Sequence, residues 1–188
     1  WPKRCVQTGG STMRCSRQAF VWLLSLAGLL LFATGARCEE LPEYRLKAAF
    51  VYNFIAYTEW PAETGSTLNV CIDGTDPFGA EIDGLEGKVA AGRKIAVHRK
   101  TTSEALRDCQ VVFVSASAID GLPRVLESLR RRPVLTVADS AGAMRRGVAL
   151  NMNMMQGKVT FEANLQAARD AGLDLSSKLL RLATEVQR

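Results

Sequence analysis

The sequence predicts an α/β fold: a twisted, mostly parallel sheet with helices on both faces, plus a C-terminal hairpin and two helices. Three observations predict it. Apolar segments rich in β-branched residues alternate along the chain with segments of helical periodicity. Residues 110–115 (QVVFVS) form the kind of continuous run found in strands buried on both faces. After Gly142, two short runs joined by a turn at residues 155–157 are typical of a hairpin.

Each element has its own signal. Helices are expected where apolar residues recur every three or four positions, and strands where β-branched runs lie between turn residues. The expected helices cover residues 43–59, 78–85, 102–107, 123–131, 164–171 and 176–186. The expected strands cover residues 68–72, 94–99, 110–115, 133–138, 148–152 and 158–163.

The first expected helix, residues 43–59, has one apolar face with the period of a helix surface. Val51 and Ile55 widen this face, and Pro61 is expected to end the helix after Trp60. The residues expected on the face are Leu46, Ala49, Phe50, Asn53, Phe54 and Tyr57.

The first 38 residues differ from the rest of the chain. Residues 19–33 are almost uninterruptedly apolar, follow Arg14 and Arg17, and precede small residues. This run is shorter than the roughly 20 residues that cross a bilayer as a helix. We therefore expect a signal peptide, residues 1–38, that is cleaved between Ala36 and Cys38 and delivers a single domain, residues 39–188, to the periplasm. An uncleaved anchor and a lipid-modified Cys38 are the alternatives.

The net charge of +5 comes from the leader. Five of the 24 basic residues and none of the 19 acidic residues lie in the first 38 positions, so the remaining chain is neutral. A neutral domain lacks the basic surface that dominates nucleic-acid binding, and we expect no nucleic-acid partner. Arg130, Arg131 and Arg132 form a local cluster, which we interpret as the solvated C-terminal end of a helix.

Two cysteines, Cys71 and Cys109, lie in the expected domain. In an exported chain such a pair predicts a disulfide, while two buried thiols or a redox-active pair are the alternatives. The strands at residues 68–72 and 110–115 are neighbours in the order 2-1-3-4-5 that is common in doubly wound sheets. Neighbouring strands bring Cα atoms to the separation that a disulfide requires.

Catalytic chemistry is sparse. The one histidine, His98, lies on an expected strand with no metal ligand at suitable spacing, and no serine lies in a GxSxG turn. Residues 73–79 (DGTDPFG) follow a strand, but we interpret Asp76 and Pro77 as the N-cap and first position of a helix rather than as part of a phosphate site. Asp73 and Asp76 are a conceivable acid/base pair. We expect no enzyme, no metal and no cofactor.

An aromatic group on the first helix allows a binding site. Phe54, Tyr57 and Trp60 could line a pocket for an apolar or aromatic ligand, with core packing as the alternative. A periplasmic small-molecule sensor is therefore the second functional hypothesis.

The chain resembles the YfiR family of small periplasmic regulators over nearly all of the expected domain. The stretches that carry this resemblance are EYRLKAAFVYNFIAYTEWP (43–61), LNVCIDGTDPFG (68–79), DCQVVFVSAS (108–117), PVLTVADSAG (133–142) and VTFEANLQAARDAGLDLSSKLLRLA (159–183). Cys71 and Cys109 match the family's disulfide positions. Residues 144–152 lack the second cysteine pair of some members, which puts redox control through this segment in doubt.

The resemblance implies a function and partners. It implies a negative regulator that binds the periplasmic part of an inner-membrane diguanylate cyclase, represses it, and so lowers cyclic di-GMP signalling and biofilm formation. An outer-membrane lipoprotein would act as antagonist, and the protein would form a homodimer. The family's C-terminal motif, which we take as a partner surface, matches Glu162, Asn164, Leu165, Arg169 and Leu173.

Overall fold

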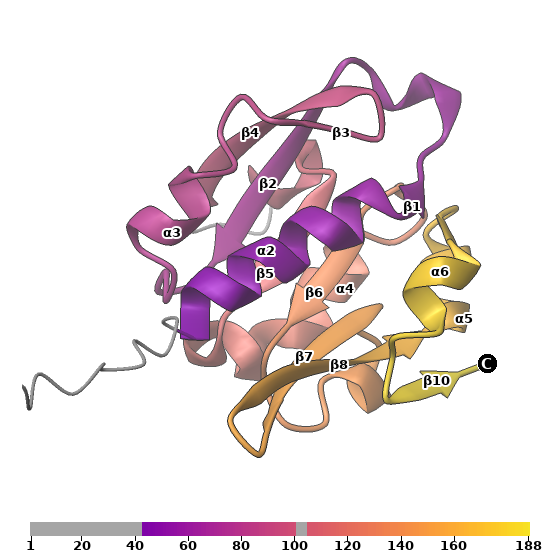
Figure 1. Ribbon diagram of the computed structural model, residues 1–188. Coiled ribbons are helices and arrows are strands. Elements are labelled where there is room, and N and C mark those ends of the chain that lie inside the picture. Colours follow the sequence, from indigo (N-terminus) through magenta and orange to yellow (C-terminus); the bar gives the residue numbers. More distant parts are fainter. Residues whose placement is uncertain (1–42, 101–104) are drawn as a thin grey trace, which may run out of the picture. The chain divides into compact units, whose positions relative to one another are not determined.

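The computed structural model describes residues 43–100 and 105–188 (Figure 1). Its centre is an eight-stranded sheet in the order β10-β8-β7-β6-β5-β2-β4-β3. The strands are β2 (Thr67–Asp73), β3 (Val89–Ala90), β4 (Arg93–Lys100), β5 (Val111–Val114), β6 (Leu135–Ala138), β7 (Leu150–Met155), β8 (Lys158–Asn164) and β10 (Glu185–Gln187). A second, two-stranded sheet pairs β1 (Thr58–Glu59) with β9 (Asp174–Leu175). The expected leader and its cleavage site lie outside the described residues.

The helices are mostly short. Only α2 (Glu43–Ala56) exceeds two turns. The other α-helices are α3 (Ala80–Asp83), α4 (Leu122–Ser128), α5 (Leu165–Asp170) and α6 (Ser177–Leu180). The 3₁₀ turns are η2 (Ala62–Thr64), η3 (Ala105–Asp108), η4 (Ala116–Gly121) and η5 (Met144–Arg146). Within residues 43–100 and 105–188, none of the helices has the length and apolar character needed to cross a membrane.

The α/β fold class and the strand order are confirmed. The five strands β4-β2-β5-β6-β7 lie side by side in the predicted order 2-1-3-4-5, and each pair is parallel. The predicted hairpin joins β7 to β8, with Met155 opposite Lys158. Both residues between the strands, Gln156 and Gly157, have a positive φ, as a tight hairpin turn requires.

The sheet separates two hydrophobic cores. Side chains alternate along each strand, so neighbouring residues enter different cores. Val111 and Phe113 of β5 pack in the core beneath α2, which lies across one face of the sheet in Figure 1. Val112 and Val114 pack in the other core, beside α4. We call these the α2 face and the α4 face.

The prediction for the first helix is wrong in its end and in part of its buried face. The helix ends at Ala56, because Thr58 and Glu59 instead pair with Leu175 and Asp174 of β9. The residues it buries are Lys47, Ala48, Val51, Phe54 and Ile55, whereas Ala49 and Asn53 are exposed. Both sets have helical spacing, and packing on the sheet selects between them.

The C-terminal helix prediction is also wrong. The expected helix at residues 176–186 is a single turn, α6, and Leu182 is 71% exposed. The chain then forms β10, which adds a parallel strand beside β8. Thr184 starts this pairing, since its backbone N–H and its hydroxyl both donate to the Phe161 carbonyl.

Three smaller helices also differ from expectation. The helix expected at residues 78–85 is confined to α3, with Gly79 rather than Asp76 as the N-cap. Asp76 caps a turn instead, because its Oδ1 accepts from the backbone N–H of Phe78 at 2.7 Å. The helix expected at residues 123–131 already ends at Ser128. The helix expected at residues 102–107 lies partly outside the described residues, and the rest of it falls in η3.

Candidate functional site

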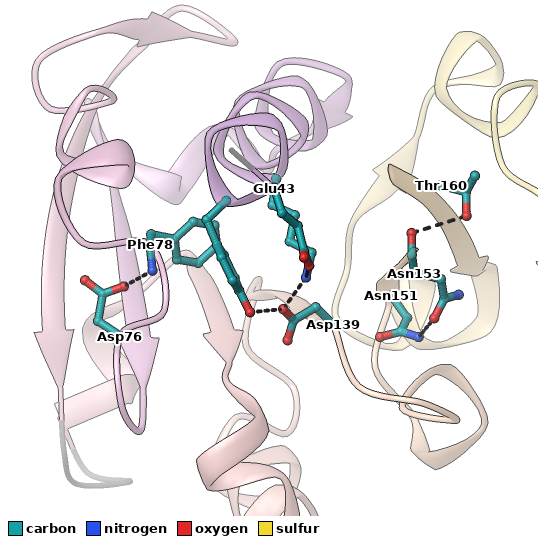
Figure 2. A network of polar contacts seen from close by, with 9 residues as sticks. Glu43, Asp76, Phe78, Asp139, Asn151, Asn153 and Thr160 are labelled. Atoms are coloured by element: carbon teal, nitrogen blue, oxygen red, sulfur yellow. Dashed lines mark hydrogen bonds and ion pairs between the residues drawn. The ribbon is translucent and has the colours of Figure 1, made fainter. Parts of the chain in front are cut away.

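A buried ion cluster lies where β6 ends on the α2 face. Asp139 directly follows β6, and its Oδ2 accepts from Lys47 Nζ at 2.7 Å and from the Tyr44 hydroxyl at 3.1 Å (Figure 2). The side chains of Lys47 and Asp139 are 5% and 3% exposed, and Glu43 completes the cluster by pairing with Lys47. Helix α2 is thereby tied to the carboxyl edge of the sheet.

Lys47 and Tyr44 are not suited to act as bases. Burial alone would lower the pKa of Lys47, but hydrogen bonds to Asp139 and Glu43 outweigh it and raise that pKa. Burial, followed by the negative charge of Asp139, raises the pKa of Tyr44. The lysine is therefore held as a cation and the phenol as a neutral donor, which suits a structural tie and not proton abstraction.

The chain packs closely against itself at the topological switch point of the sheet. In open α/β sheets, ligands bind outside the carboxyl ends of the strands where the order reverses, which is between β2 and β5 here. Gly74 follows β2 at φ 89° and lies so close to Ser115 and Ser117 that a Cβ could not be accommodated. The backbone N–H of Thr75 donates to Ser117 Oγ at 2.8 Å. Above this contact, the Phe78 ring packs at 4.7 Å from Phe113, measured between centroids.

The carboxylates of the loop are not arranged as an acid/base pair. Asp76 Oδ2 accepts from Arg99 Nε at 2.8 Å, and Arg99 also donates to Asp83. The Asp73 carboxylate has no hydrogen-bond partner within the described part of the chain, and burial raises its pKa. One carboxylate is thus engaged in a surface network while the other stands apart from it.

The predicted disulfide joins Cys71 on β2 to Cys109, with Cα atoms 6.0 Å apart. His98 lies beside it on β4, and its Nε2 is 3.0 Å from Asn69 Oδ1. Asn69 in turn donates to the Asp108 carbonyl at 3.0 Å. No group of three or more His, Cys, Asp or Glu residues within the described ranges could hold a metal ion.

The five motif residues near the C-terminus lie in one local segment but do not form one surface. Asn164 caps α5, since its Oδ1 accepts from the Ala167 N–H at 2.9 Å. Leu165 and Leu173 are buried in the core of the α2 face. Arg169 is exposed and Glu162 is half-buried, so these two are the motif side chains that a partner could reach.

Glu162 belongs to a polar row across β7 and β8. Asn151, which is fully buried, donates to Glu162 Oε2 at 3.4 Å and to Asn153 Oδ1 at 3.3 Å. The Thr160 hydroxyl donates to the Asn153 carbonyl at 3.4 Å, as Figure 2 shows. The sequence analysis did not identify this row, although alternating polar residues in the hairpin are its signal.

The three aromatic residues considered as a ligand site are in different environments. Phe54 is fully buried, with its ring 5.1 Å from that of Phe161. Tyr57 is 40% exposed. Trp60 is partly buried, and its Nε1 donates to the Ile55 carbonyl at 3.2 Å. Phe54 therefore packs within the core, apart from solvent.

Lys47 and Asp139 are not among the site residues predicted from the sequence. The sequence signal that points to them is a lysine on the apolar face of the first expected helix.

Two solved structures match this chain at low sequence identity. A conserved domain protein from Vibrio cholerae has 13% identity and a TM-score of 0.49, and the match covers 79% of this chain and 61% of that one. An ABC domain in complex with L-Trp from Streptococcus pneumoniae has 10% identity and a TM-score of 0.51, with 76% and 60% covered. The second likeness concerns the fold alone, and this chain spans about three fifths of either protein's length.

The sequence itself matches a known family. The model of the YfiR/HmsC-like family covers residues 44–184, a range that includes every described element from β1 to α6. This family suggests a periplasmic regulator of cyclic di-GMP signalling. Because the match extends over most of its length, the chain belongs to the YfiR/HmsC-like family.

Proposed function

We propose that this protein is a periplasmic repressor. It binds the periplasmic part of an inner-membrane diguanylate cyclase and holds that enzyme inactive, which lowers cyclic di-GMP and biofilm formation. The observation that carries the proposal is the family match over residues 44–184. The leader, residues 1–38, would direct export, and residues 39–188 would act as a single domain.

Packing at the carboxyl edge of the sheet supports a function through protein contact. Where this type of fold holds substrates, Gly74 lies against Ser115 and Ser117, and Phe78 packs on Phe113. The lysine there, Lys47, is paired and held protonated. These features leave surface recognition as the better explanation than catalysis.

We place the contact with the cyclase at Glu162 and Arg169. These side chains lie on β8 and α5, before and after the cap at Asn164, and they are the accessible part of the family motif. An outer-membrane lipoprotein would compete for the repressor, and the repressor would act as a homodimer. Charged side chains at such a contact would mainly set specificity and association rate.

Deletion of the gene tests the repressor function. Cyclic di-GMP, measured by mass spectrometry in a strain that expresses the partner cyclase, should rise in the deletion strain and return to its original level on complementation. The rise should disappear when the cyclase gene is deleted as well. Unchanged cyclic di-GMP in the single deletion would refute the proposal.

Charge reversal tests the contact surface separately. Arg169→Glu should weaken copurification with the cyclase's periplasmic domain and fail to restore low cyclic di-GMP. Arg124→Glu is the matched control, because Arg124 is an exposed arginine on α4 outside the motif. Equal complementation by both variants would reject this surface while leaving the repressor function intact.

A further inference from the structure

A pocket of about 350 Å³ lies between α4 and α5. The apolar part of its lining consists of Leu126 and Leu129 on the α4 side, Ala167 and Ala171 on the α5 side, and Val134 before β6. Small-molecule sites have volumes of about 300–1,000 Å³ and are mainly apolar with a few placed polar groups. The pocket therefore has the size and lining of a site for a small molecule with an apolar body.

The polar groups of the pocket are mostly donors. Arg130 and Arg131 line it, together with Thr136 and Gln187. The Thr136 hydroxyl, on a residue that is 6% exposed, accepts from the Ala149 N–H, and it donates to no other residue of the described chain. Gln187 uses its Oε1 as an acceptor from Asn164, so its amide N–H groups remain available.

Acceptors are few in the same pocket. Asp170 is the one acid among its lining residues, and its Oδ1 already accepts from Gln166 Nε2 at 2.7 Å. Of the two guanidinium groups, Arg130 already pairs with Glu127 at 3.3 Å, so Arg131 is the cation available to a ligand. A ligand that complements this arrangement supplies acceptors and negative charge, and a planar carboxylate fits a guanidinium with two parallel hydrogen bonds.

Arg131 adds an independent observation. It has φ 60°, a left-handed conformation that favours glycine, in the turn that follows α4. It has no hydrogen-bond or ion-pair partner within the described residues that would account for a side chain at this position. A non-glycine residue held in this conformation costs stability, and such outliers cluster at binding sites.

We propose that the pocket between α4 and α5 binds a small amphipathic carboxylate. Its apolar body lies between Leu129 and Ala167, and its carboxylate meets Arg131, with Thr136 as a second donor. This site is separate from the motif side chains Glu162 and Arg169, neither of which lines it. The inference goes beyond repression and does not depend on which cyclase is bound.

Calorimetry with the purified full chain tests the ligand class. Octanoate is the probe, with 1-octanol as its neutral counterpart and octylammonium as its cationic one. Octanoate should bind at one site. Octanol and octylammonium should bind at least about tenfold more weakly, because they cannot accept the charge-assisted hydrogen bonds that a carboxylate accepts. Absence of octanoate binding at millimolar concentration, or equal binding of octanol, would overturn the proposal.

Arg131→Gly separates binding from stability. The variant should weaken octanoate binding about tenfold, while its melting temperature stays the same or rises by about 2 °C because glycine suits the left-handed conformation. Arg124→Ala, on α4 and outside the pocket lining, should leave the affinity unchanged. Unchanged affinity in Arg131→Gly would contradict the assignment of the carboxylate to this residue.

Two further variants locate the ligand. Ala167→Phe fills the pocket and should abolish octanoate binding, whereas Ala49→Phe, at an exposed position of α2, should not. Asp170→Asn removes the acid from the lining and should strengthen octanoate binding a few-fold. Retained binding in Ala167→Phe, with the variant folded by circular dichroism, would place the ligand elsewhere and refute the site.

Discussion

The two faces of the sheet are stabilised in different ways. On the α2 face, aromatic rings fill the core in edge-to-face contacts, with Phe54 5.1 Å from Phe161 and Phe78 4.7 Å from Phe113. The core of the α4 face contains no aromatic ring among the described residues, and it encloses the disulfide instead. One face is closed by packing, and the other is held partly by a covalent bond.

The difference explains where space is left for binding. Large rings beneath a 14-residue helix fill the α2 face up to the carboxyl edge of the sheet. Short elements and aliphatic side chains cover the α4 face, and Leu129 of this core also lines the pocket between α4 and α5. Ring packing therefore stabilises the α2 face, while the α4 face combines a disulfide with an accessible surface.

The largest expected effect comes from a substitution that creates a cavity in the core of the α2 face. Phe54→Ala should lower the free energy of unfolding by about 3–5 kcal/mol, because it removes a fully buried ring and leaves a cavity. Urea unfolding followed by circular dichroism measures the change. Tyr57→Ala, one turn away and 40% exposed, is the control and should cost less than about 1 kcal/mol. Equal costs in the two variants would show that this face does not depend on ring packing.

The next test removes the covalent bond from the other face. Cys71→Ala combined with Cys109→Ala should lower the free energy of unfolding by about 2–4 kcal/mol. The disulfide joins residues 38 positions apart and so restricts the conformations of the unfolded chain. Urea unfolding of the double variant and of the reduced wild-type protein should give similar losses. A loss below about 1 kcal/mol would mean that the aliphatic core is sufficient without the disulfide.

The sequence predicted the centre of the fold well for a physical reason. Strands such as β5 are buried on both faces, so their apolar runs are continuous and easily recognised. The order 2-1-3-4-5 then followed from short connections between parallel strands. The pairing of Cys71 with Cys109 was consistent with that order.

Pairing between distant segments caused the errors. Thr58 and Glu59 leave the helical pattern because they find partners in β9, more than 100 residues later. Residues Glu185–Gln187 become a strand because β8 offers them an open edge. Local periodicity does not contain this information. The pocket was equally hidden, since Arg131 and Thr136 come together with Gln187 only through the fold.

The buried cluster at Asp139 adds an electrostatic contribution to the α2 face. Asp139→Asn should lower the free energy of unfolding by about 2 kcal/mol at neutral pH. This is less than the loss expected when a buried ion pair is fully broken, because Lys47 keeps Glu43 as a partner. Glu81→Gln, which breaks the exposed pair with Arg45, is the control and should cost less than about 1 kcal/mol.

The same cluster predicts a pH dependence. The pKa of Lys47 is raised, so Lys47 keeps its proton in the folded state at a pH where it loses that proton in the unfolded chain. The contribution of the Lys47 ion pairs to stability is therefore fully present below about pH 10.4, the ordinary pKa of lysine. It is lost as the pH rises through the folded-state pKa of Lys47. The raised pKa of Tyr44 acts in the same direction. Urea unfolding at increasing alkaline pH should bring wild type and Asp139→Asn together; a constant difference would contradict this account.

The smallest expected effect lies at the carboxyl end of β2, where Asp73 has no ion-pair partner among the described residues. Alternation along the strand directs it to the side of Cys71, the α4 face. Burial raises the pKa of Asp73, so the charged carboxylate destabilises the folded state at a pH above the ordinary carboxyl pKa. This cost disappears as the pH falls below that value.

Asp73→Asn should therefore increase the free energy of unfolding at pH 7 by less than about 1 kcal/mol, because partial solvent contact screens the charge. The gain should vanish near pH 3 in urea unfolding. A loss of stability at pH 7 would instead mean that the Asp73 carboxylate contributes a favourable interaction at this edge, and the contrast with the paired Asp139 on the α2 face would fail.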